Sequence, residues 1–161
     1  ETEETLRNNV YDRQRKANEL RNRLESELAT AHIEAKFAWE KGATEAQMKP
    51  VLKALRAAQW RWDFAVASHG GAFHAPQEFQ RILGHGLDNA MQARIATTKV
   101  LASLGFTGDV PLPDISTKSK AQAYIGLDIA SEKQLKDEFI KTIVPEWLKK
   151  AKENNRLKDK N

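Results

Sequence analysis

The stretch TLRNNVYDRQRKANELRNRLESELATAHIEAKFAWEK, residues 5–41, contains neither proline nor glycine. Small or aliphatic side chains recur at every seventh position, and further apolar side chains fill the adjoining rows at helical spacing. The seventh positions are Val10, Ala17, Leu24, Ala31 and Ala38. The pattern predicts one helix on the order of 50 Å long, longer than a small domain is wide. Such a helix needs a partner along much of its apolar stripe.

Two more long helices are expected after it. Gly42 suits the position just after a helix end, and Thr44 with Gln47 has the spacing of a capping box. Pro50 suits the first turn of a second helix that ends near Ser68. Its expected apolar face comprises Val51, Leu55, Ala58, Trp62, Ala65 and Val66. A third helix is predicted from Ala75-Pro76 to about Leu104, stopped by Gly105, with a broad apolar face that includes Phe79, Leu83, Met91, Ile95 and Leu101.

The remainder reads as shorter helices after a loop over residues 105–116, which holds two glycines and two prolines. Residues 117–125 form a short helix that we expect Ser116 to cap. Ser131 is expected to cap a further helix that turns Leu135, Phe139, Ile140 and Ile143 inward and is kinked or restarted at Pro145. No strand pattern is present. The predicted fold class is all-α, with three long helices plus short C-terminal helices, and residues 1–161 are expected to form a single helical domain.

Composition narrows the function classes. The chain has 161 residues and no cysteine, which excludes disulfides, thiolate metal sites and covalent haem attachment within this sequence. No apolar run is long enough to span a membrane. The net charge of +4, with a lysine-rich stretch over 149–160, does not by itself indicate binding to nucleic acid. The first residues carry no signal region, so the protein is either cytosolic or has lost a targeting segment.

Two of the four histidines flank a Gly-Gly pair. His69 and His74 lie in SHGGAFHAP, residues 68–76, and His74 stands just before a helix that begins with proline. The positive end of that helix favours the neutral imidazole, the form that binds iron. The alternative is that His74 is an ordinary loop residue and His69 an exposed helix end. Zinc fits poorly, because only Glu78 is near as a third ligand.

Two tryptophans stand out on the second helix. Trp60 and Trp62 are two residues apart and therefore point roughly 200° away from each other. One can lie in the local core while the other faces a partner or solvent, although neighbouring helices could equally cover both.

Several segments together resemble the C-terminal region of the ammonia-forming cytochrome c nitrite reductases. They cover essentially the whole chain in order and with similar spacing. The segments are GATEAQMKP (42–50), AQWRWD (58–63), ASHG (67–70), HAP (74–76), PDISTK (113–118), KAQ (120–122), IGL (125–127) and FIKT (139–142).

The resemblance implies a specific function. The family's enzymes are periplasmic pentahaem cytochromes that reduce nitrite to ammonium with six electrons. Their haem c attachment motifs, active-site residues and calcium ligands lie upstream of this region, so the chain is expected to be a C-terminal fragment without catalytic residues of its own. By the same resemblance, His74 is a distal axial ligand to one haem iron, and His69 is a second candidate.

The implied partners are the missing N-terminal haem domain, a second copy bound through the long helices, and an electron-donor cytochrome or quinol dehydrogenase. In the fragment, His74 is expected on an open surface, beside one face of Trp60 or Trp62. The alternative hypothesis is a free-standing helical interaction or scaffold protein without haem. A binder of nucleic acid would rest only on the net charge and the lysine-rich tail.

Overall fold

The computed structural model describes residues 1–157 and divides the chain into two compact units, residues 1–112 and the unit that begins at Pro113. The described residues form helices and no strand, which confirms the all-α fold class. The helices are α1 (Glu3–Glu40), α2 (Glu45–Ala67), α3 (Gly71–His74), α4 (Pro76–Ser103), α5 (Lys118–Tyr124) and α6 (Ile129–Glu153). The expectation that residues 1–161 act as a single domain stays a prediction.

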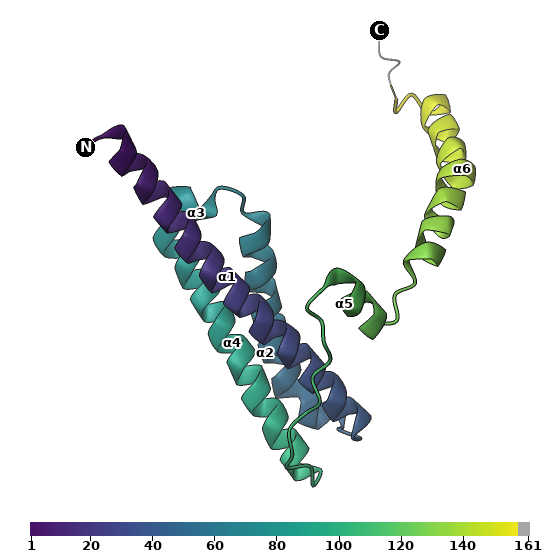
Figure 1. Cartoon of the computed structure of the whole chain (residues 1–161). Coiled ribbons are helices and arrows are strands. Elements are labelled where there is room, and N and C mark those ends of the chain that lie inside the picture. Colours follow the sequence, from purple (N-terminus) through teal and green to yellow (C-terminus); the bar gives the residue numbers. More distant parts are fainter. Residues whose placement is uncertain (158–161) are drawn as a thin grey trace. The chain divides into compact units, whose positions relative to one another are not determined.

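The first unit is a bundle of the three long helices, as predicted. α1, α2 and α4 lie side by side, and α4 packs along both of the others (Figure 1). The largest side chains that are fully buried are Leu24, Met48, Leu83, Val51 and Thr97. Thr97, the buried polar member of this set, donates its hydroxyl to the carbonyl of Ala93 at 2.8 Å. The core is therefore continuous along the bundle and satisfies its buried hydroxyl within α4.

The apolar stripe of α1 is covered from within the chain. Ala17, Leu24, Ala31 and Ala38 are all buried, as the seven-residue repeat predicts, and the helices that cover them are α2 and α4. The partner that this stripe requires is thus intramolecular. Before Ala17, α1 has no buried side chain.

Helix ends follow the expected signals with one exception. Gly42 and Gly105 have φ of +89° and +82°, a left-handed conformation that favours glycine. The Thr44–Gln47 capping box is present in full. Pro50 lies inside α2, one turn beyond the predicted place, because the helix begins at Glu45. Pro50 is exposed, so water can reach the carbonyl that the missing N–H leaves free.

Three predicted core positions are exposed instead. Val66, Met91 and Ile95 are 41%, 45% and 47% exposed, because they lie at the margins of their helical stripes. Periodicity finds the centre of an apolar face more reliably than its edge.

The second unit differs from prediction in its caps and its burial. Thr117, rather than Ser116, caps α5. Asp128, rather than Ser131, caps α6, where its carboxylate accepts from the N–H groups of Ala130 and Ser131. α6 continues through Pro145 without a restart.

No described residue from 113 onward is buried. The prediction that α6 turns its apolar residues inward is therefore wrong for Leu135, Phe139 and Ile140, and Ile143 is half-buried. Within residues 1–157 no helix has the length and hydropathy needed to cross a bilayer. The end of the lysine-rich stretch, residues 158–161, lies outside the described part.

Candidate functional site

The segment between α2 and α4 is a tight, hydrogen-bonded connection. Ser68 caps α2, and the backbone then closes a single helical turn, α3, across the Gly-Gly pair. The N–H of His74 donates to the carbonyl of Gly70 at 2.9 Å, and the N–H of Ala75 donates to that of Gly71 at 3.1 Å. The sequence predicts a break here, whereas the chain forms a helical turn that fixes where the following residues lie.

His74 is the last residue of α3 and stands directly before the α4 turn that Pro76 begins. Its side chain is exposed, and within residues 1–157 its imidazole makes no hydrogen bond. The ring meets Phe73 edge to face, with centroids 5.1 Å apart. The aromatic neighbour is therefore Phe73, and the expected position beside Trp60 or Trp62 is wrong.

The two glycines provide room rather than unusual backbone angles. Neither Gly70 nor Gly71 has a positive φ. A Cβ at Gly70 would lie 2.8 Å from Cδ2 of His74, and a Cβ at Gly71 would lie 2.4 Å from Cδ2 of Phe79. Glycine at these positions lets the imidazole and the Phe79 ring approach the backbone closely.

A charged hollow surrounds His74. Residues from the exposed N-terminal half of α1 line it together with the start of α4: Asp12, Arg13, Lys16, Gln77 and Glu78. Hydrogen bonds from Lys16 and Arg15 lower the pKa of Asp12, so its carboxylate stays ionised. A hydrogen bond from Arg81 lowers the pKa of Glu78 in the same way. The imidazole thus opens to solvent among charged side chains, of which Asp12, Lys16 and Glu78 already have ion-pair partners.

His69 faces a different hollow. It is exposed and lies with Asn18 and Arg21 of α1 and with Phe73. The two candidate histidines therefore line different hollows, although Phe73 is a neighbour of both. Among the described residues no three or more His, Asp or Glu side chains are placed to hold a metal ion together.

The other two histidines are engaged by neighbours. His32 Nε2 lies 3.3 Å from Oε1 of Gln59, which links α1 to α2. His85 Nδ1 lies 3.3 Å from Arg81. In this respect both differ from His74 and His69.

The two tryptophans confirm the interpretation in which one lies against the core and the other is exposed. Trp62 packs against the core of the bundle, and its Nε1 is buried without a hydrogen-bond partner in the described chain. Trp60 is 72% exposed. It lines an open groove between α1 and α2 together with Trp39 and Leu52. The groove is an apolar strip of surface on an otherwise charged bundle.

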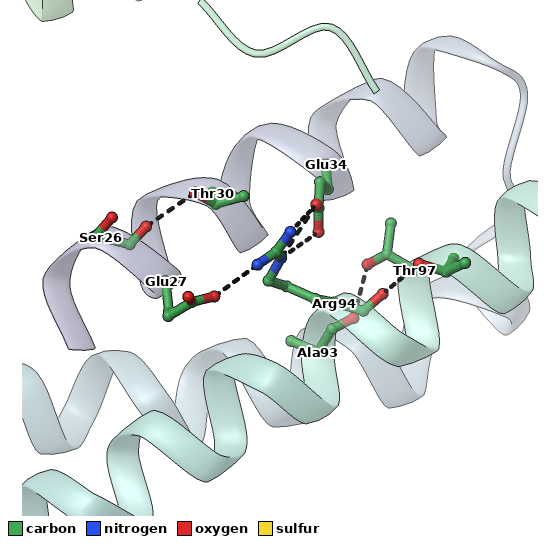
Figure 2. A network of polar contacts seen from close by, with 8 residues as sticks. Ser26, Glu27, Thr30, Glu34, Ala93, Arg94 and Thr97 are labelled. Atoms are coloured by element: carbon green, nitrogen blue, oxygen red, sulfur yellow. Dashed lines mark hydrogen bonds and ion pairs between the residues drawn. The ribbon is translucent and has the colours of Figure 1, made fainter. Parts of the chain in front are cut away.

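Sequence reasoning missed an ion-pair network that joins α1 to α4. Figure 2 shows the guanidinium of Arg94 between the carboxylates of Glu27 and Glu34. Arg94 binds both oxygens of Glu34, with Nη2–Oε1 at 2.8 Å and Nε–Oε2 at 3.0 Å, and its Nη1 reaches Glu27 at 2.6 Å. The Glu34 hydrogen bonds raise the pKa of Arg94. The signal available in the sequence was two glutamates one heptad apart, which lie on one face of α1.

Comparison with known proteins gives the family. A family model described as cytochrome c552 matches residues 1–158. The chain is similar to a cytochrome c-552 of Parabacteroides distasonis, 75% identical over 157 residues that make up 98% of this chain and 32% of that protein. It is also similar to the cytochromes c-552 of Bacteroides fragilis (74% identity, 98% of this chain, 32% of the relative) and Porphyromonas gingivalis (64%, 94% and 30%).

The chain therefore belongs to the cytochrome c552 family. It spans about a third of the length of the curated relatives it matches.

Proposed function

We propose that this chain is the haem-supporting and dimerising C-terminal part of a periplasmic cytochrome c nitrite reductase, which reduces nitrite to ammonium with six electrons. The observation that carries the proposal is the free imidazole of His74, exposed on a rigid turn with space for its ring beside Gly70. Membership of the cytochrome c552 family and the third of the relatives' length that the chain spans support it.

The residues of this chain can provide an axial ligand to the iron of haem c but cannot attach the haem covalently. The sequence has no cysteine, so covalent attachment must come from another part of the polypeptide. Axial ligation needs only one imidazole on each side of the iron. His74 can supply that imidazole, because its ring has no hydrogen bond to give up and is open to solvent. His69 is the second candidate for the same role.

The chemistry of haem is electron transfer through the iron when both axial positions are filled. With haem bound, His74 would supply its imidazole to the iron and would keep nitrite from that position. The backbone hydrogen bonds of α3 and the start of α4 at Pro76 fix the backbone that carries the imidazole. The ring of Phe73 packs edge to face against it. No residue of this chain acts on nitrite directly.

The remaining partners are part of the same proposal. The open groove of Trp39, Leu52 and Trp60 supports a second copy bound along the long helices. The buried stripe of α1 is not available for that contact. The N-terminal haem domain supplies the haems and the calcium ligands, and an electron-donor cytochrome or quinol dehydrogenase supplies electrons.

The test is a chimera in which residues 1–161 replace the matching third of the Parabacteroides distasonis relative. The chimera, produced with haem, should form ammonium from nitrite with a chemical reductant. The isolated chain should form none above a free-haem control, because nothing in it can hold haem c covalently. Activity of the isolated chain, or an inactive chimera that is folded and loaded with haem, would contradict the proposal.

A further inference from the structure

α6 carries a continuous row of apolar side chains, which we call the α6 stripe. At 100° per residue these side chains fall on one side of the helix. The stripe consists of Phe139, Ile140, Ile143, Val144, Trp147, Leu148 and Ala151. The rings of Phe139 and Trp147 touch edge to face with centroids 5.3 Å apart, so the row is contiguous.

The second unit by itself leaves the α6 stripe largely exposed. No residue of α6 is buried, and Trp147 and Leu148 are 58% and 49% exposed. Phe139 and Ile140 are 42% and 47% exposed. Contiguous exposed apolar surface of this kind marks a contact site.

The charge of α6 favours a protein surface over a membrane. The helix carries six lysines and five acidic residues, so its polar side is close to neutral. Helices that lie on anionic membranes are rich in Lys and Arg on the polar face. Here Glu138 and Lys149 share the side opposite the stripe, and Lys149 pairs with Glu153 at 4.0 Å. The mixture of charges is typical of a helix that faces water on one side and protein on the other.

The length of the stripe disfavours a coiled coil with a second copy. Ile140, Val144, Trp147 and Ala151 follow at steps of four, three and four, as in a coiled coil. The stripe covers fewer than two heptads, however, and stable coiled coils sustain their pattern over several. A wide, short stripe fits the surface of a folded body instead.

The occupant that the length of the relatives offers is the rest of the longer protein. The chain spans only about a third of its relatives, so about two thirds of their length is not represented in it. We infer that the α6 stripe docks onto the haem-bearing part of the complete cytochrome polypeptide. This inference rests on the proposed function, in which such a part exists.

Amide hydrogen exchange over residues 139–151 tests the inference in two samples, the 161-residue chain and the haem-loaded chimera described above. Exchange should be at least a hundredfold slower in the chimera. In the chimera, the double substitution Phe139→Ala with Trp147→Ala should make exchange over these residues at least tenfold faster. The matched control, Glu138→Ala with Lys149→Ala on the opposite side of the same helix, should leave it unchanged.

Several outcomes would overturn the docking. Equal exchange in the two samples would do so, as would protection already present in the isolated chain. A dimer of the isolated chain, or binding to phosphatidylserine vesicles, that is lost in Trp147→Ala would assign the stripe to a different occupant. The absorption spectrum separates the two proposals: a chimera with normal haem bands and an unprotected stripe contradicts the docking alone. A folded chimera that fails to load haem contradicts the proposed function and this inference with it.

Discussion

Gly86 marks the closest approach of α4 to its neighbours, and replacing it tests the packing of the bundle. A Cβ at this position would lie 2.6 Å from Cδ2 of Leu24 and 3.3 Å from Cβ of Arg61. Leu24 is fully buried and has no free space to move into. Gly84, on the same helix, would place a Cβ with nothing within 4 Å. The two glycines therefore form a matched pair with opposite surroundings.

Alanine in place of glycine stabilises a helix interior by about 1 kcal/mol. Overpacking a buried contact costs about 1–3 kcal/mol. We therefore expect Gly84→Ala to raise the free energy of unfolding by about 1 kcal/mol. Gly86→Ala should leave it unchanged or lower it by up to about 2 kcal/mol, since the two effects oppose each other.

Urea unfolding followed by circular dichroism measures both variants against the parent chain. A third comparison isolates the clash: in a Leu24→Ala background, Gly86→Ala should become stabilising, because the isobutyl group that it meets is gone. If Gly86→Ala stabilises the parent chain as much as Gly84→Ala does, the close approach of α4 to α1 is wrong.

Three further predictions concern polar contacts. Arg94→Met should lower the free energy of unfolding by about 1–2 kcal/mol in urea titrations. Arg81→Met, whose ion pair is more exposed, should change it much less; equal effects would refute a structural role for the Arg94 network. The Lys120 ammonium, helped by Ser116, lowers the pKa of Asp114 from 3.8 to about 2, so this contact stabilises the fold above about pH 4 and is lost as the pH falls toward 2. Carboxyl NMR should find that midpoint, and a higher one in Lys120→Ala; a normal midpoint in the parent chain would contradict the contact. Asp128→Ala should destabilise the start of α6 and reduce helicity by circular dichroism, and unchanged helicity would exclude Asp128 as its cap.

The long helices were predictable because their signals are local. The seven-residue repeat of α1, the Thr44–Gln47 box and the glycines at 42 and 105 each act within one or two turns. The caps of α5 and α6 were misplaced by one and three residues, since several adjacent Ser, Thr and Asp side chains can cap and only the backbone geometry selects one of them.

What covers each apolar face could not be read from periodicity. The repeat in α1 indicated a stripe that needs a partner, but not that α2 and α4 of the same chain supply it. The apolar residues of α6 gave the same signal, yet none of them is buried in the described chain. A pattern defines which side of a helix is apolar, while the identity of its neighbour depends on contacts far away in sequence.

The candidate site was only partly predictable. The sequence singled out His74 through its place before Pro76, and the structure leaves its imidazole exposed. Glycine is required at position 70 because a Cβ there would meet the imidazole of His74. This requirement depends on where the His74 side chain lies and not on a backbone angle, so the sequence does not reveal it. The link from Arg94 to Glu34 depends on the register between α1 and α4, which no local pattern contains.

Electron paramagnetic resonance of the haem-loaded chimera tests the central claim, that His74 completes the coordination of one haem iron. His74→Ala should convert one low-spin haem signal to high spin and leave the others unchanged, because a single axial ligand is lost. His32→Ala, at a histidine already engaged by Gln59, should leave every low-spin signal in place. If all low-spin signals survive in His74→Ala, His74 is not a ligand, and their loss in His69→Ala would transfer the role to that residue.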